Sequence, residues 1–283
     1  MSNSLAFVWL HLEGGLMNFT DSHCHLDFDA FANELPQLIR QCASASIHQI
    51  IIPATHPDTW QKVINLAKAQ RHNGCKIFSC LGIHPWFLKG LTSVHLDDLA
   101  KAVQRNTQKV DDNIVAIGET GIDGVISKEQ DNLNQQFTFF NYQLALANQY
   151  QLPVIVHHRQ SHQYIIPLIK KAKLTAGGVI HAFSGSYQQA RDYVDLGFQL
   201  GVGGTITYPR ANKTINAIRR LPLSSLVLET DAPSMPLNAK QGQNNSPLEL
   251  VTIFETLVQI REEKREVIAE QIEANVNQLF NLP

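Results

Sequence analysis

Apolar and polar residues alternate along this chain with two periods, and the shorter apolar runs recur eight times. Each run is rich in Val, Ile or Leu, has the length of a buried β-strand and is followed by polar or turn-forming residues. The runs span residues 18–23, 48–53, 76–82, 113–118, 153–157, 178–182, 198–203 and 226–229. Such continuous apolar character is typical of parallel strands that are covered on both faces.

Between these runs, apolar residues return at helical spacing. The clearest example is residues 127–150, whose single apolar stripe consists of Leu133, Phe137, Phe140, Leu144 and Ala147. Ser127 and Gln130 have the spacing of a capping box, which predicts that this helix begins near residue 127.

Eight strand and helix alternations predict an α/β protein with a (β/α)8 TIM barrel over residues 17–283. A doubly wound open sheet is the alternative, but no G-x-G-x-x-G follows the first strand. Residues 1–16 are expected to be an N-terminal extension, because Met17 directly precedes the first run. The connection 232–247 is long for such a fold, which makes it a candidate lid.

Composition narrows the class of protein. With 44% hydrophobic and 17% charged residues, the chain has the balance of a globular domain. A net charge of −2 excludes a protein that holds nucleic acid mainly through a basic surface. The four cysteines form no C-x-x-C pair, which predicts reduced thiols in a cytoplasmic protein. No apolar segment has the length of a membrane span, and no interface pattern stands out, so a monomer is expected.

Two histidines at alternate positions end the first run. His23 and His25 are expected to point to the same face, roughly 6.5–7 Å apart along the chain, so they can chelate one ion. Alone the pair is a weak signal, since two hydrogen-bonded histidines without a metal fit it equally well.

The other strand ends carry the same kind of residue. Glu119, His157, His181 and Asp231 come from the fourth, fifth, sixth and eighth runs, at the face where barrel active sites are built. Six ligands exceed the four of a closed zinc site, which predicts two divalent ions that share a carboxylate. Nitrogen and oxygen donors are compatible with Mg, Mn, Zn, Fe or Ni. Such a pair turns water into a nucleophile and clamps a phosphoryl or carbonyl oxygen.

Four further residues are candidates for substrate binding. Arg159 lies two residues beyond His157 and either grips a phosphate oxygen or is an ordinary surface arginine. His84 either contacts the substrate and donates to a leaving group, or is a loop histidine ordered by its neighbours. Tyr208 and Arg210 present the same choice, with base stacking open to Tyr208.

Seven stretches together resemble one family, the TatD-type metal-dependent hydrolases, which are barrel deoxyribonucleases of the amidohydrolase-like group. The stretches are "DSHCHLD", "GIHPW", "GETGID", "LPVIVHHR", "VIHAFSG", "GVGGTITYPR" and "ETDAP". The stretch "GVGGTITYPR", with "MPLN" and "GQ", is most similar to the YjjV-like branch.

The resemblance implies a role for each candidate ligand. His23, His25 and Asp231 would hold one metal ion, and His157 and His181 would hold the other. Glu119 would bridge the two ions, and Asp231 would also act as the general base. The implied activity is cleavage of DNA phosphodiester bonds.

Two departures from the family pattern bear on the substrate. Lys240, Gln241 and Gly242 stand where the fuller nuclease pattern has an Arg-Gly pair, and Gly124 stands where an aromatic residue is common. A hydrolase of a small phosphoester, ester or amide is therefore the alternative, although related enzymes of that kind often bridge their metals with a modified lysine at the position of Glu119. A non-catalytic metal or nucleic-acid binding protein is the third possibility, and a spare base such as Asp231 speaks against it.

Overall fold

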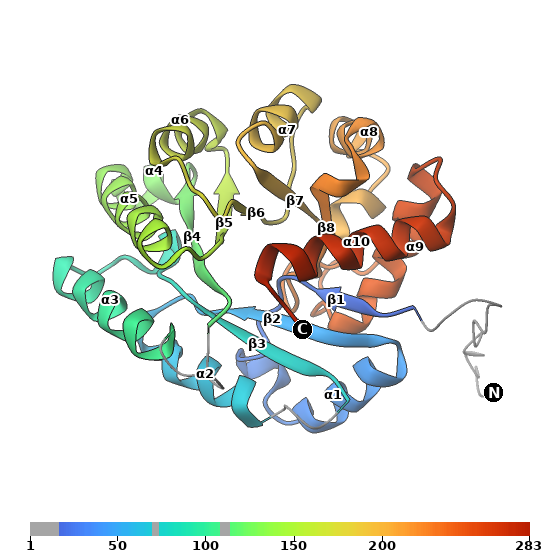
Figure 1. Cartoon of the computed structure of the whole chain (residues 1–283), viewed down its shortest axis with the longest axis horizontal. Coiled ribbons are helices and arrows are strands. Elements are labelled where there is room, and N and C mark those ends of the chain that lie inside the picture. Colours follow the sequence, from blue (N-terminus) through green and yellow to red (C-terminus); the bar gives the residue numbers. More distant parts are fainter. Residues whose placement is uncertain (1–16, 70–73, 108–113) are drawn as a thin grey trace.

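The computed structural model describes residues 17–69, 74–107 and 114–283, and within them eight parallel strands form one sheet in sequence order. Figure 1 shows the strands around a common centre with the helices outside them. The strands are β1 (Phe19–Asp21), β2 (Ile47–Pro53), β3 (Lys76–Leu81), β4 (Ala116–Asp123), β5 (Val154–Arg159), β6 (Gly178–Ile180), β7 (Phe198–Val202) and β8 (Leu226–Leu228). The extension expected at residues 1–16 lies outside the described residues.

The helices follow the strands as the alternation predicts. They are α1 (Leu35–Ser44), α2 (Trp60–Ala69), α3 (Ser93–Thr107), α4 (Ile126–Gln130), α5 (Leu133–Tyr150), α6 (His162–Ala172), α7 (Tyr187–Val194), α8 (Asn212–Arg220), α9 (Leu250–Ile260) and α10 (Arg265–Phe280). No helix of the described ranges is long and apolar enough to cross a membrane.

Backbone hydrogen bonds join the last strand and the residues after it to the first strand and the residues after it. Ser22 N donates to Leu228 O at 2.9 Å, and Asp231 N donates to His23 O at 2.8 Å. These bonds bring β8 beside β1 and nearly close the sheet, which confirms the predicted (β/α)8 barrel. They also place the residues just after β1 next to those just after β8.

A layer of apolar side chains fills one end of the barrel. It consists of Ile51, Cys80, Ala116, Ile155, Val179 and Val227, with Val276 and Phe280 of α10 packed against them. Because side chains on a strand alternate between its faces, residues two positions further along point into the same interior. The apolar layer therefore fixes the direction of the polar layer that follows it toward the carboxyl ends.

Strand β4 differs from the prediction, which ended it at Gly118. It continues to Asp123, because Thr120 to Asp123 pair in register with Val156 to Arg159 of β5. Between Ile117, paired with Val154, and Thr120, paired with Val156, β4 has one residue more than β5. Such a bulge redirects side chains, and here it lies at Glu119, inside the strand rather than at its end.

The helix expected over residues 127–150 is two helices. Asp131 has a left-handed backbone conformation (φ 47°) that ends α4, and α5 begins only at Leu133. The predicted capping box is therefore wrong. Ser127 lies inside α4, and its hydroxyl donates to Gly124 O at 3.1 Å. The apolar stripe itself packs into the core as expected, with Phe140 and Leu144 buried.

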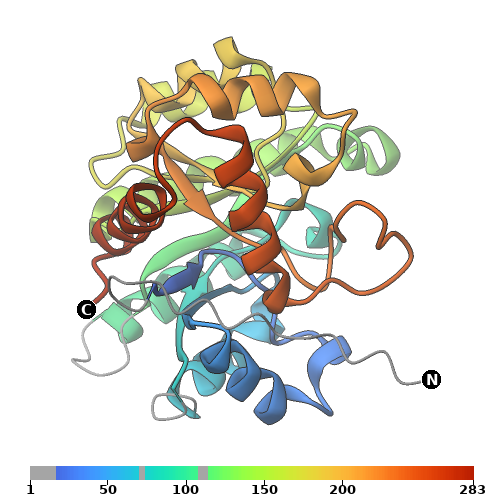
Figure 2. The ribbon, with the colours of Figure 1, turned by 90° about the vertical axis from the view of Figure 1, so that its right-hand side faces the viewer.

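The long connection between β8 and α9, orange in Figure 2, projects from the barrel. The end of the connection is tied to its start, because Asn245 Nδ2 donates to Thr230 O at 2.8 Å and to Met235 O at 3.2 Å. Tyr208 Oη donates to Pro236 O at 2.6 Å and ties the same loop to the residues after β7. A lid role for it stays a prediction.

All four cysteines are buried free thiols, as the sequence predicts.

Candidate metal centre

The carboxylate of Glu119 lies between two pairs of histidines. Its Oε1 is 3.1 Å from His157 Nδ1 and 3.3 Å from His181 Nε2. Its Oε2 is 3.3 Å from His23 Nε2 and 3.4 Å from His25 Nε2. One carboxylate oxygen thus faces each pair, which is the placement that a bridging ligand needs.

The nitrogens of His23 and His25 lie near each other and near two carboxylate oxygens, at distances typical of ligands of one ion. The two Nε2 atoms are 3.1 Å apart, and each is 3.5 Å from Asp231 Oδ1. Donors bound at about 2.0–2.1 Å in a tetrahedron lie roughly 3.3–3.4 Å from one another. The distances between the two histidine nitrogens, and from each nitrogen to Glu119 Oε2 and to Asp231 Oδ1, are near that spacing, so the residues fit a divalent metal.

His84 approaches the same carboxylate but has a different proton arrangement. Its Nε2 is 3.2 Å from Glu119 Oε1, while its Nδ1 accepts a hydrogen bond from Trp86 N at 3.1 Å. Since Nδ1 is an acceptor, the neutral ring carries its proton on Nε2. The spacing of His84, Glu119 and His157 would allow a metal ion, but the tautomer makes His84 a hydrogen-bond donor toward the centre.

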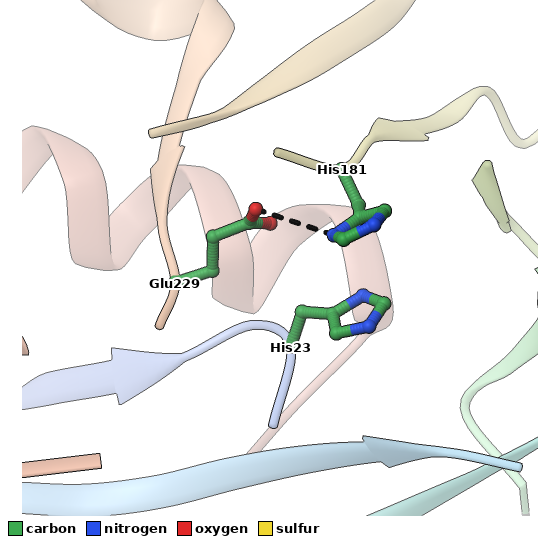
Figure 3. A group of neighbouring side chains, drawn as sticks. All are labelled: His23, His181 and Glu229. Atoms are coloured by element: carbon green, nitrogen blue, oxygen red, sulfur yellow. Dashed lines mark ion pairs between the residues drawn. The ribbon is translucent and has the colours of Figure 1, made fainter. Parts of the chain in front are cut away.

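Two buried carboxylates contact His157 and His181, each at the ring nitrogen that points away from Glu119. His157 Nε2 is 3.0 Å from Asp123 Oδ2, and His181 Nδ1 is 3.4 Å from Glu229 Oε1. Figure 3 shows Glu229 directed at His181, with the ring of His23 stacked beside it. A carboxylate on the outer nitrogen holds a proton there, so that when the ring is neutral its other nitrogen presents a lone pair toward Glu119.

Backbone N–H groups donate hydrogen bonds to both carboxylates and hold them in place. Asp123 Oδ1 accepts from Val125 N at 2.8 Å and from Ile126 N at 2.9 Å. Glu229 accepts from Ala182 N. Glu229 fits beside β7 because Gly201 has no side chain, since a Cβ there would lie 2.1 Å from Glu229 Oε2.

A third buried carboxylate, Asp21, joins the ends of β1 and β8. It accepts from His23 N at 3.2 Å, from Thr230 N at 3.0 Å and from Thr230 Oγ1 at 2.6 Å. Its burial raises the pKa of the Asp21 carboxyl to about 8. These bonds fix the segment that carries His23 against the segment that carries Asp231.

Protons are shared unequally within the cluster. Burial alone would lower the pKa of His25, but its hydrogen bonds to Asp231 and Glu119 raise it to about 10. The pKa of His181 is likewise raised, against its burial, by Glu119 and Glu229. Burial and the nearby His181 lower the pKa of His23. Burial lowers the pKa of His84 to about 4, consistent with a neutral ring.

The histidines in turn hold the central carboxylates in their charged form. Burial alone would raise the pKa of Glu119, yet His84, His181 and His23 lower it well below its ordinary value. The pKa of Asp231 is lowered in the same way by its hydrogen bond to His25, against its burial. The centre is therefore an array of ionised carboxylates that needs positive charge.

The remaining candidates lie around this centre. Arg159 is half exposed, with its guanidinium Nη1 3.9 Å from Asp123 Oδ2. Tyr208 contacts the loop after β8, and the Arg210 guanidinium lies over its ring at 5.3 Å. The contacts of Tyr208 and Arg210 thus run to the loop and to each other, and the structure brings only Arg159 and His84 to the cluster.

The structure brings the six predicted ligand candidates together in one cluster, and beside them lie Asp123 and Glu229, which the sequence did not single out. The signal for Glu229 was available, because it lies two residues after the inward-facing Val227 and two before Asp231. Asp123 lies four residues after Glu119, beyond the predicted end of that strand.

Comparison with known proteins decides the family. Residues 20–281 match the family model described as TatD related DNase. The chain belongs to the TatD DNase family. This confirms the family resemblance seen in the sequence, and the chain is accordingly a metal-dependent hydrolase.

Individual relatives are similar to this chain over nearly its whole length. The chain is 41% identical to the uncharacterized metal-dependent hydrolase YjjV of Escherichia coli K12, covering 95% of this chain and 100% of that protein. It is 39% identical to an uncharacterized metal-dependent hydrolase of Haemophilus influenzae, covering 94% and 100%. The crystal structure of E. coli YjjV superposes with a TM-score of 0.88 over 94% of this chain and 99% of that one. The similarity to the YjjV-like branch is thereby confirmed.

Proposed function

We propose that this chain is a two-metal phosphodiesterase that cleaves DNA. The observation that carries the proposal is the position of Glu119, whose two oxygens face two separate histidine pairs. A single ion would use only one of these pairs and one oxygen of Glu119, whereas two ions that share the carboxylate would use both. The family model, described as TatD related DNase, supports the choice of substrate.

In this proposal each donor has one place. His23, His25 and Asp231 would hold one divalent ion, His157 and His181 would hold the other, and Glu119 would be shared between them. The donors are imidazole nitrogens and carboxylate oxygens, which suit Mn, Zn, Fe or Ni and, through the carboxylates, Mg. When bound, the ions lower the pKa of water and neutralise charge on a phosphoryl oxygen.

Asp231 is the general base of the proposed reaction. Its Oδ1 faces His23 and His25. Its side chain is 13% exposed, the largest fraction among the six ligand residues. Water therefore reaches Asp231 more easily than the other five, and its carboxylate, held charged by the neighbouring histidines, takes the proton of the attacking water.

His84 and Arg159 contact the substrate phosphate. His84 presents its Nε2 proton toward the centre, so it donates to an oxygen of the phosphate or of the leaving group. Arg159, half exposed beside Asp123, carries a guanidinium suited to two parallel hydrogen bonds with phosphate oxygens. Tyr208 and Arg210 are proposed as more distant contacts of the DNA backbone on the loop side.

DNA suits a protein of this charge only if the centre itself attracts it. The net charge is −2, so the divalent ions supply the local positive potential that the surface as a whole lacks. The second candidate is hydrolysis of a small phosphoester, which needs the same centre. The departures from the nuclease pattern at Lys240 and Gly124 favour this candidate.

The test is hydrolysis by protein that has been stripped with a chelator and then refilled with Mg, Mn or Zn. Substrates are a single-stranded oligodeoxynucleotide and bis(p-nitrophenyl) phosphate. Glu119→Ala removes the bridge, and Glu129→Gln, an exposed carboxylate on α4, is the matched control. Metal-restored DNA cleavage that is lost in Glu119→Ala and kept in Glu129→Gln supports the proposal.

Two other results of this experiment would change the conclusion. Cleavage of the small ester alone would assign the chain to the second candidate. Full metal occupancy with no hydrolysis of either substrate would contradict phosphodiesterase activity and favour a binding protein.

A further inference from the structure

Two adjacent aromatic side chains stand exposed beside the metal centre. Trp86 is 42% exposed and Phe87 is 40% exposed. In the described part of the chain, the large hydrophobic side chains with such exposure are Trp86, Phe87, Val94, Met235 and Val267. Large aromatic rings carry a high cost when left in water, so a pair of them at the edge of a reactive centre indicates a binding surface.

The two rings border the histidines that face Glu119 Oε1. Trp86 is 5.6 Å from the ring of His84 and 6.2 Å from that of His157, measured between centroids. Phe87 is 5.7 Å from the ring of His84. They follow His84 closely in the short helix η3 (Pro85–Phe87), so a group held at the centre on the side of His84 and His157 has these exposed aromatic rings beside it.

Trp86 is held in place by its own polar atom. Its Nε1 donates to Asp123 Oδ2 at 2.6 Å, and Asp123 is fully buried. Since the indole N–H is already used, the part of Trp86 left for a ligand is the face of its ring. A ring fixed in this way loses little conformational entropy when something stacks on it.

A guanidinium lies close to this ring. Arg159 Nη1 is 3.9 Å from the same Asp123 oxygen that accepts from Trp86, and the Arg159 side chain is 50% exposed. An aromatic face and a half-exposed guanidinium beside a phosphate-binding centre match two parts of a nucleotide, the planar base and the charged phosphate. A sugar phosphate or an alkyl phosphate would leave the aromatic pair unused.

We propose that Trp86 and Phe87, together with Arg159, form a subsite that stacks on the nucleobase next to the phosphate held at the metal centre. The proposal rests on the proposed function and narrows it, because it makes the base itself part of what is recognised. Stacking on an aromatic ring tolerates any base, so the subsite selects nucleotides over other phosphoesters without reading sequence.

The test compares two ligands that differ only in the base. Thymidine 5′-monophosphate and 2-deoxyribose 5-phosphate are titrated calorimetrically into metal-loaded protein, with inorganic phosphate as the reference for the centre alone. Base stacking on one aromatic residue predicts that the nucleotide binds about 5- to 150-fold more tightly than the sugar phosphate. Bound metal is measured in every sample.

Variants separate stacking from an indirect effect through Asp123. Trp86→Leu keeps apolar bulk but removes the aromatic face, so the ratio between the two affinities should fall toward one. Trp86→Phe keeps an aromatic face without the N–H and should retain most of the ratio. Val94→Ala, at an exposed position on α3, is the control and should leave the ratio unchanged.

Three results overturn the subsite. Equal binding of the two ligands by the unchanged protein refutes it while leaving the phosphodiesterase proposal intact. A proportional loss of both ligands in Trp86→Leu, with the ratio preserved, shows that Trp86 acts through Asp123 instead. If inorganic phosphate and both ligands all fail to bind fully metal-loaded protein, the proposed function fails and the subsite fails with it.

Discussion

Replacing Asp123 by Asn tests how the second histidine pair is prepared for metal. Asp123 uses Oδ1 to accept from Val125 N and Ile126 N, and Oδ2 to accept from Trp86 Nε1 and His157 Nε2. In Asp123→Asn the amide oxygen is expected to stay on the two backbone N–H groups, because leaving both unpaired in a buried place is costly. The amide NH2 then faces His157.

That exchange reverses the hydrogen bond on His157. An NH2 group can only donate, so His157 must accept at Nε2 and move its proton to Nδ1, the nitrogen that faces Glu119. A protonated Nδ1 cannot bind a metal ion. Loss of an outer carboxylate partner typically lowers metal affinity 10- to 100-fold, which is about 1.4–2.7 kcal/mol. We expect Asp123→Asn to weaken one ion by at least this factor and to leave the ion at His23 and His25 unchanged.

The measurement is equilibrium dialysis against Mn or Zn with a competing chelator, which gives the number of ions and the affinity of each. Nitrogen-15 spectra of the histidines report the tautomer of His157 in parallel. Glu129→Gln, which changes an exposed carboxylate on α4, is the control and should leave both affinities unchanged. If Asp123→Asn binds every ion as tightly as the unchanged protein, the carboxylate does not set the tautomer and the reasoning is wrong.

Three further predictions follow from the geometry around the centre. Gly201→Ala places a Cβ 2.1 Å from the Oε2 of Glu229, so it should displace that carboxylate and lower both the melting temperature and the metal content. Gly121→Ala combines a backbone φ of 148° with a Cβ 2.1 Å from His157 O; we expect a loss of about 3 kcal/mol or more in denaturant unfolding. Metal-free protein should lose stability as pH rises from 6.5 to about 10, because folded His25 keeps a proton that the unfolded chain has already released. Thermal melts in chelator at pH 6 and pH 9.5 test this, and equal midpoints would contradict it.

The strands were predictable because a strand that is buried on both faces consists mostly of apolar residues, and such runs are visible in the sequence. The boundaries of β4 were not, because the bulge at Gly118 and Glu119 depends on the register with β5. The break between α4 and α5 was missed for a similar reason, since Asp131 is compatible with a helix as well as with the left-handed conformation it adopts.

The ligands were predictable because a barrel brings its strand ends to one face, whatever the details of each strand. The carboxylate partners of His157 and His181, Asp123 and Glu229, were not predicted, although both residues lie in or near predicted strands. Which carboxylate reaches which ring depends on contacts across neighbouring strands, and Asp123 reaches His157 only because β4 continues past the bulge. Likewise, the proton on His84 follows from one backbone N–H, that of Trp86, which no residue pattern reveals.

The charges of the cluster explain why a cation belongs in it. Glu119 and Asp231 are held ionised at the centre, although both are surrounded by protein. In the metal-free chain, protons on His25, His157 and His181 supply the opposing charge. The nearby carboxylates raise the pKa values of these three histidines. A divalent ion needs the same nitrogens as lone pairs and therefore displaces those protons. Protons and metal thus compete for one site, so the folded barrel is compensated in either state and metal loading completes a structure already formed.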